Sequence, residues 1–144
     1  MKLVKVLSVF ALSTLLFNAC STNIPKGSNV NIKKDVSINN TSWKLVEEDE
    51  IVKGFNGEDV HLTITENGTK VNGFAGCNRF STETVLSAEN ISFSPIASTK
   101  MLCPTIKTED SFLALLEDTN RYEIKGNELY FYKGNMLLLK FKSN

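Results

Sequence analysis

Three cysteines and one histidine are the residues of this chain best suited to covalent or metal chemistry. A thiolate beside an imidazole is a nucleophile, so Cys77 and His61 are candidates for a thiol enzyme. With Cys103 they form a candidate zinc set, but they lack the close Cys-x-x-Cys spacing of structural zinc sites. The sequence also has no phosphate-binding loop, dinucleotide fingerprint or serine elbow. We therefore expect no enzyme, no metal and no cofactor.

The charged residues favour no charged macromolecule as a partner. Residues 1–19 hold two of the 16 basic residues and none of the 16 acidic ones, so the rest of the chain has a net charge of −2 with His61 neutral. No basic stripe is present, which argues against nucleic acid. The acidic run at 47–50 lacks the alternating oxygen ligands and sharp glycine turn of a calcium loop. We interpret it as a solvated loop.

The N-terminus has the pattern of an export signal. Two lysines precede an apolar run at residues 6–17, which is shorter than the ~20 residues of a membrane-spanning helix. The run ends at Cys20, and this arrangement resembles the lipobox of bacterial lipoproteins, whose cysteine is acylated after cleavage. We predict a lipoprotein signal peptide at 1–19 and a lipid anchor on Cys20. The alternative is an ordinary secreted protein with a coincidental cysteine.

The number of cysteines bears on their pairing. If Cys20 carries lipid, Cys77 and Cys103 remain as an even pair in an oxidising compartment. A disulfide between them would close a loop of about 26 residues, which chain-entropy reasoning values at ~3.5 kcal/mol. The alternative is two buried free thiols.

A polar segment separates the signal from the rest of the chain. Residues 21–41 are rich in Asn, Ser and Lys and lack an apolar period, so we predict a lipidated, flexible tether at 20–41 and one domain at 42–144. Four apolar residues of the segment would suit a weak edge strand, but the surrounding asparagines argue against it: Val30, Ile32, Val36 and Ile38.

From Ser42 onward, alternation of apolar and polar residues dominates and predicts strands. The expected strands are residues 43–47, 60–65, 70–74, 84–86, 90–96, 121–124, 128–132 and 136–141. Asn67-Gly68 predicts a hairpin turn between two of them. Tyr130 and Tyr132 alternate with Phe131, so one face carries aromatic residues that would suit either wall packing or a lipophilic cleft.

One segment has helical spacing instead. Phe112, Leu115 and Leu116 form an apolar stripe over residues 109–117, and Thr108 is a suitable N-cap. A helix there would cover the sheet. We therefore predict a mainly β (α+β) fold, a small antiparallel, barrel-like curled sheet of about seven or eight strands with one covering helix.

Residues 73–80 are the densest group of unusual residues. Two glycines in a strand, Gly73 and Gly76, indicate a bulge or a close backbone approach. Asn78 suits a left-handed turn, and Arg79 offers a planar fork of donors. Arg79 would either lock this turn through a salt bridge or present its donors to a ligand.

Together with Trp43, the segments GCNRF at 76–80 and TKMLC at 99–103 resemble the META domain of HslJ-like bacterial lipoproteins. This resemblance implies a barrel-like antiparallel fold with one helix, a place in the cell envelope, a link to heat shock and stress, and no established reaction. The motif residues it marks as possible binding residues are Gly76, Asn78, Arg79, Phe80, Thr99 and Met101.

These observations predict a non-enzymatic envelope lipoprotein, a monomer that is held to the membrane by its lipid and binds or stabilises another envelope protein. The alternative is a carrier of a small apolar ligand or lipid in a half-open barrel. Ser21, rather than Asp, follows Cys20, which by resemblance to enteric lipoproteins favours the outer membrane, facing the periplasm.

Overall fold

The computed structural model describes residues 35–104 and 106–144. The expected signal peptide, Cys20 and most of the expected tether lie outside the described residues. Within them, no helix is long and apolar enough to cross a membrane. The elements are β1 (Ser42–Glu47), β2 (Glu50–Ile51), β3 (His61–Thr65), a 3-10 turn (Glu66–Gly68), β4 (Lys70–Phe74), β5 (Arg79–Leu86), β6 (Ile91–Phe93), β7 (Ala97–Ser98), α1 (Ile106–Glu117), β8 (Arg121–Lys125), β9 (Glu128–Lys133) and β10 (Met136–Lys142).

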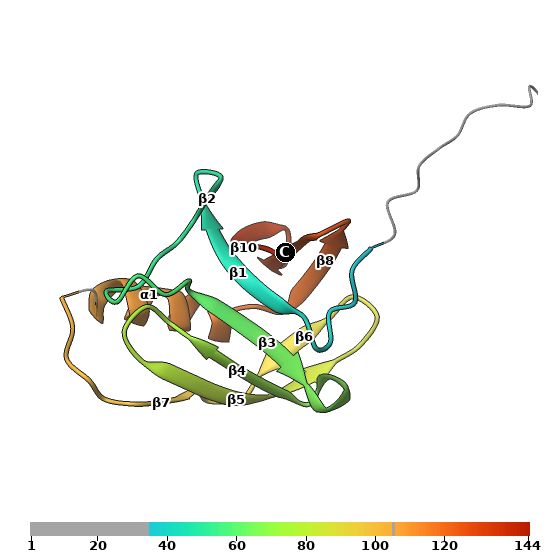
Figure 1. Cartoon of the computed structure of the whole chain (residues 1–144). Coiled ribbons are helices and arrows are strands. Elements are labelled where there is room, and N and C mark those ends of the chain that lie inside the picture. Colours follow the sequence, from blue (N-terminus) through green and yellow to red (C-terminus); the bar gives the residue numbers. More distant parts are fainter. Residues whose placement is uncertain (1–34, 105) are drawn as a thin grey trace, which may run out of the picture. The chain divides into compact units, whose positions relative to one another are not determined.

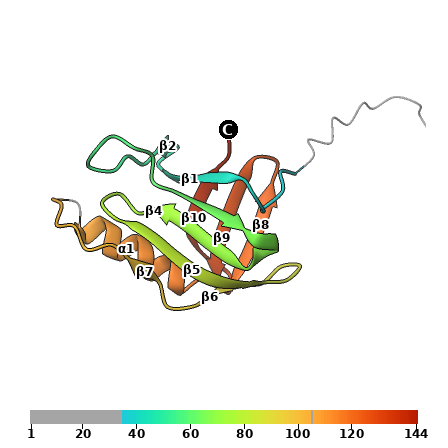
Figure 2. The same ribbon diagram turned by 60° about the horizontal axis from the view of Figure 1, so that its bottom comes forward.

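The strands form one antiparallel sheet in the order β6-β5-β4-β3-β1-β10-β9-β8, with β2 added to β1 and β7 to β5. The sheet curls around α1, as Figures 1 and 2 show from two sides. Its two edges meet only at an isolated bridge between Asn90 and Arg121, so the barrel is not closed. The predicted mainly β fold with one covering helix is confirmed. The described residues hold ten strands, two more than the eight expected. The additional strands are β2 and β7, whose two residues each are too few to show an alternation of apolar and polar residues.

Alternation along the strands places the core inside the curl. The fully buried side chains include Trp43, Leu62, Phe131 and Phe141. Phe112 of α1 packs edge-on against Phe141, with ring centroids 6.3 Å apart. The apolar stripe of the helix therefore covers the open side of the sheet, as its spacing predicts.

The packed part of the chain begins before residue 42. The Val36 N–H donates to the Gly126 carbonyl at 2.8 Å, and Ile38 is buried against the core. The Ile38 carbonyl accepts a hydrogen bond from the buried Trp43 indole N–H at 3.1 Å. Residues 36–41, expected as part of a flexible tether, are thus fixed to the domain beside the turn between β8 and β9.

Two elements begin earlier than expected. The helix starts at Ile106, so Thr108 lies inside it and is not its N-cap. Strand β5 starts at Arg79 and not at residue 84. Its inward positions include Thr82 and Thr84, whose hydroxyls donate to carbonyls at 2.7 Å. Because threonines occupy these inward positions, the sequence of this strand does not show the alternation of apolar and polar residues that predicts a strand.

Candidate functional site

The turn between β4 and β5 is held by covalent and polar links to distant segments. Cys77 and Cys103 form a disulfide, with their Cα atoms 5.9 Å apart. Gly76 has a φ of +103°, a left-handed conformation that disfavours other residues. Its carbonyl accepts a hydrogen bond from the Phe55 N–H at 2.9 Å, which ties the loop of residues 52–59 to the same turn.

Asn78 is the polar centre of this turn and is only 1% exposed. Its side-chain oxygen accepts hydrogen bonds from the Thr99 hydroxyl and the Met101 N–H, both at 2.7 Å. Its side-chain amide donates to the Met101 carbonyl at 3.1 Å and to Glu109 Oε1 at 2.9 Å. Its backbone N–H donates to Glu109 Oε2 at 2.6 Å. One residue thus joins the turn, the segment 99–103 and α1.

Glu109 is a site residue that sequence analysis missed. It is only 2% exposed, and both its oxygens accept hydrogen bonds from Asn78. A signal was present in the sequence, because Glu109 shares the inward face with Phe112 and Leu116 at i+3 and i+7. An acid in such a stripe needs a buried donor, and the asparagine of the motif supplies it.

Arg79 forms the salt bridge that was one of its two interpretations. Its guanidinium lies 2.8 and 2.9 Å from the two carboxylate oxygens of Glu58 and stacks over the Phe74 ring at 5.1 Å. The Arg79 side chain is 59% exposed, and exposed pairs contribute ~0–1 kcal/mol. The ion pair orients the 52–59 loop against the turn more than it stabilises the fold.

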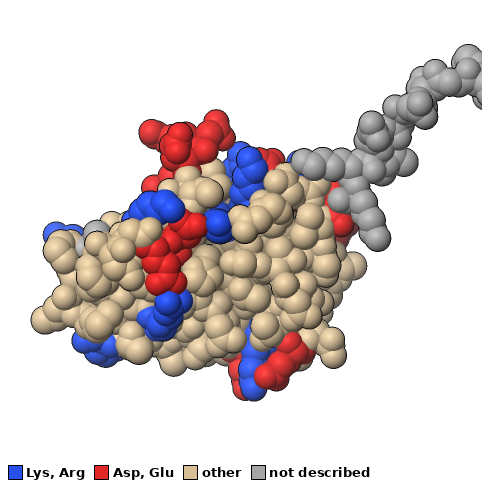
Figure 3. Space-filling view, viewed as in Figure 1, with Lys and Arg blue, Asp and Glu red and all other residues tan. Residues whose placement is uncertain are grey.

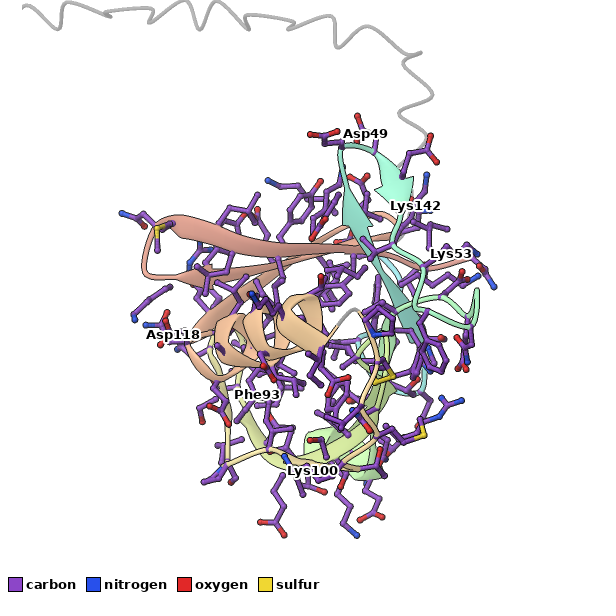
Figure 4. The ribbon with its side chains drawn as sticks, turned by 90° about the vertical axis from the view of Figure 1, so that its left-hand side faces the viewer. Asp49, Lys53, Phe93, Lys100, Asp118 and Lys142 are labelled. Carbon is purple, nitrogen blue, oxygen red and sulfur yellow. A yellow bond between two sulfur atoms is a disulfide. The ribbon has the colours of Figure 1, made fainter. Side chains whose placement is uncertain are left out.

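Three large apolar side chains project around this turn: Phe55, Met101 and Leu102, which are 51%, 53% and 94% exposed. We call these three residues the apolar tip. Their segments lie at one end of the domain, and the described chain enters at the opposite end (Figures 1 and 2). Figure 4 views the tip end, with Lys53 and Lys100 on its two loops and the disulfide between them.

A groove of about 420 Å³ extends from the apolar tip between the segment 96–102 and α1. Ile96, Leu113 and Ala114 are among its lining residues.

Phe80, another motif residue, is buried and packs on Phe112 with centroids 5.8 Å apart. The motif residues therefore divide into two groups. Gly76, Asn78 and Phe80 are buried, whereas Arg79, Thr99 and Met101 reach solvent.

The interior of the described domain offers little room for a ligand. An apolar cavity between β1 and α1 has a volume of about 70 Å³ and is lined by residues such as Leu45, Val60 and Phe112. A cavity of ~150 Å³ is what a single benzene needs. This cavity is too small for a lipid chain.

The candidate catalytic and metal residues are not assembled. Cys77 is in the disulfide, so it offers His61 no thiolate. His61 Nδ1 lies 2.9 Å from the Asp59 carbonyl oxygen and 4.0 Å from a Glu58 oxygen. Among the described residues, no three His, Cys, Asp or Glu side chains lie close enough to hold a metal ion. The acidic residues 47–50 form an exposed hairpin tip, which is red at the top of Figure 3.

The aromatic face of β9 is covered by charged side chains. The rings of Tyr130 and Tyr132 stack with centroids 6.5 Å apart, and Arg121 lies over Tyr132 at 4.0 Å. The Tyr130 hydroxyl donates to Glu128 at 2.5 Å, and this bond lowers the pKa of Glu128. Each hydroxyl already has a carboxylate partner, Tyr132 with Glu123 at 3.2 Å. These rings are wall packing and leave no lipophilic cleft.

Comparison with known proteins adds a family and a fold. Residues 36–144 match the family model described as META domain. The chain is similar to a protein from Burkholderia xenovorans solved by NMR, at 23% identity and a TM-score of 0.56 over 74% of this chain and 83% of that one. A second NMR structure matches at 19% identity and a TM-score of 0.57, over 74% and 94% of the two chains. No curated protein matches the chain significantly.

Proposed function

The chain belongs to the META domain family, and on that basis we propose that it is a lipid-anchored binding protein of the bacterial cell envelope whose apolar tip docks an envelope protein. Cys20 would be the lipid anchor, and the outer membrane, facing the periplasm, would be its location. A role in the stress response fits the resemblance to HslJ-like lipoproteins. No catalytic step is part of the proposal, because the reactive residues are paired or dispersed.

The observation that carries the proposal is Leu102, which is 94% exposed on a segment with little freedom to move. Cys103 binds it covalently to the β4–β5 turn, and Met101 makes two hydrogen bonds to Asn78. An apolar side chain that cannot fold back into the core costs little entropy when a partner covers it. Exposed apolar patches of this kind mark interaction sites.

The position of the tip also fits an anchored protein. The described chain enters beside the β8–β9 turn, at the end opposite the tip (Figure 1). The point at which a tether would join the domain is therefore remote from the tip. Met and aromatic residues are enriched in protein interfaces, and the tip holds one of each.

The interior of the domain does not support the alternative function as a carrier. A carrier of an apolar ligand would need an enclosed space for it, and the cavity between β1 and α1 has a volume of only about 70 Å³. A filled core with exposed apolar side chains favours protein contact instead.

Site-specific photo-crosslinking tests the docking surface. A benzophenone amino acid at Leu102 should give a discrete cross-linked protein in native membranes. The matched control is Val85, which is 73% exposed on β5 outside the tip. The product should disappear when Phe55→Ser and Met101→Ser are added. Equal products from both positions, or none from Leu102, would contradict the proposal.

Metabolic labelling tests the anchor separately. An alkynyl fatty acid should label the wild-type chain and leave Cys20→Ala unlabelled, and the membrane fraction should lose the variant. An unlabelled wild-type chain would reject the lipid anchor and leave the docking surface to the cross-linking result.

A further inference from the structure

The outer face of β3, β4 and β5 carries a row of three polar side chains. Thr63 pairs with Asn72 across β3 and β4, and Asn72 pairs with Ser81 across β4 and β5. Directly paired residues in an antiparallel sheet point to the same face, with Cβ atoms ~5 Å apart. The inward neighbours Leu62, Val71 and Phe80 are buried, so the row faces solvent.

The three side chains of this row have no hydrogen-bond partner among the described residues. Other polar side chains of the same strands are satisfied, as Thr82 and Thr84 donate to carbonyls at 2.7 Å. The row therefore presents a hydroxyl, a carboxamide and a second hydroxyl in a line, all available to a ligand. Such groups both donate and accept hydrogen bonds.

The row lies in a groove of about 620 Å³, within the ~300–1,000 Å³ of ligand sites. His61, Arg79 and Thr99 line the same groove. Gly73 lies beside the row, and a Cβ there would be 2.2 Å from the His61 carbonyl oxygen. Gly73 pairs with the inward residues Leu62 and Phe80, so the missing side chain lets β3 and β4 pack closely on the core side of the row.

The groove is electrically neutral along its floor. Arg79 at one end is paired with Glu58, and Lys70 beyond the other end is paired with Glu66 at 3.1 Å. In Figure 3 the surface over β3, β4 and β5 is mainly tan, with charged atoms at its margins. An anionic ligand would have to displace Glu58 from Arg79, whereas a neutral ligand meets free donors and acceptors.

We propose that this groove binds a neutral saccharide chain through Thr63, Asn72 and Ser81. Sugar hydroxyls and N-acetyl amides donate and accept in the same manner as the row, and the repeating units of a chain suit polar groups at regular strand spacing. The groove is distinct from the apolar tip, so the domain would bind a glycan on one face and a protein at one end.

NMR titration of the full-length chain tests this site, in a detergent without a sugar headgroup. The probe is the N-acetylglucosamine tetrasaccharide, and sodium phosphate is the anionic comparison. The side-chain amide of Asn72 and the backbone amides of Thr63 and Ser81 should shift saturably with the tetrasaccharide. Asn72→Ala and Ser81→Ala should each weaken binding about three- to tenfold, the value of one or two neutral hydrogen bonds.

Ser92→Ala is the matched control, because Ser92 is an exposed strand serine that does not line the groove. It should leave the affinity unchanged, and the amide spectra of all three variants should remain those of the folded domain. Three results would overturn the proposal. They are no shift with millimolar tetrasaccharide, binding that Asn72→Ala and Ser81→Ala leave intact, and shifts produced by phosphate alone.

Discussion

Asn78 holds Glu109 with two hydrogen bonds, one from its backbone N–H at 2.6 Å and one from its side-chain amide at 2.9 Å. Both residues are almost fully buried. A buried carboxylate needs this degree of hydrogen bonding to offset its desolvation. The pair therefore fixes α1 to the turn that carries the disulfide. The segment 99–103, which includes Met101 and Leu102 of the apolar tip, is hydrogen-bonded to the same asparagine.

Asn78→Ala should lower the free energy of unfolding by roughly 3 kcal/mol, because it removes five side-chain hydrogen bonds and leaves buried partners unsatisfied. Urea denaturation measures this change. Asn72→Ala, an exposed asparagine on β4, should change the value by less than about 0.5 kcal/mol. In a double-mutant cycle, Asn78→Ala and Glu109→Ala should couple by about 1–3 kcal/mol. Simple additivity would show that the contact has no energetic role.

Removing the disulfide should destabilise the domain by about 3.5 kcal/mol, because the unfolded chain without the cross-link has a higher conformational entropy. The variant is Cys77→Ala with Cys103→Ala, compared with the wild type by urea denaturation. Hydrogen exchange should also show faster exchange of the Met101 amide. Cys20→Ala is the control, and it should leave the unfolding midpoint unchanged. Equal midpoints for the double variant and the wild type would contradict this expectation.

Acid should destabilise the protein through carboxylates whose pKa values are lowered by folding. The hydrogen bond from Tyr130 and the contact with Lys140 lower the pKa of Glu128 below its ordinary 4.5. A lowered pKa stabilises the fold above pH 4.5, and this stabilisation is lost as the pH falls through the folded value. Tyr130→Phe should therefore reduce the loss of stability between pH 6 and pH 3.

Tyr122→Phe is the control for that pH effect. Its hydroxyl donates to the Ser87 carbonyl at 3.0 Å, a partner that does not titrate in this range. The variant should lower the urea midpoint by a similar amount at pH 6 and pH 3. If Tyr130→Phe behaves in the same way, its hydroxyl does not account for the lowered pKa of Glu128.

Gly73→Ala should destabilise the sheet by more than about 2 kcal/mol, because the new methyl group would lie 2.2 Å from the His61 carbonyl oxygen and 2.5 Å from the Phe80 ring. Gly57→Ala is the comparison, since a Cβ there meets no atom within 4 Å. Its only cost is the backbone strain of a residue with a side chain at a φ of +80°. Thermal unfolding should therefore rank Gly73→Ala well below Gly57→Ala. The reverse order would show that β3 and β4 can separate at little cost.

The sequence alone determined eight of the ten described strands, the helix and most of the faces that they bury. Period-two alternation places Leu62 and Ile64 inside β3, and helical spacing places Phe112 and Leu116 under α1. These patterns are readable because neighbours along one element share its geometry. The motifs around Cys77 and Cys103 also indicate the family.

Only the tertiary structure decided which side chains meet. Asn78 and Glu109 are 31 residues apart, and Arg79 is 21 residues from Glu58. The row of Thr63, Asn72 and Ser81 exists because two strand registers bring it into line. Register and loop closure depend on the packing of the whole sheet, since a slip of one residue moves every side chain to the other face. The sequence determines which donors and acceptors are present, and the tertiary structure determines which of them form hydrogen bonds with one another.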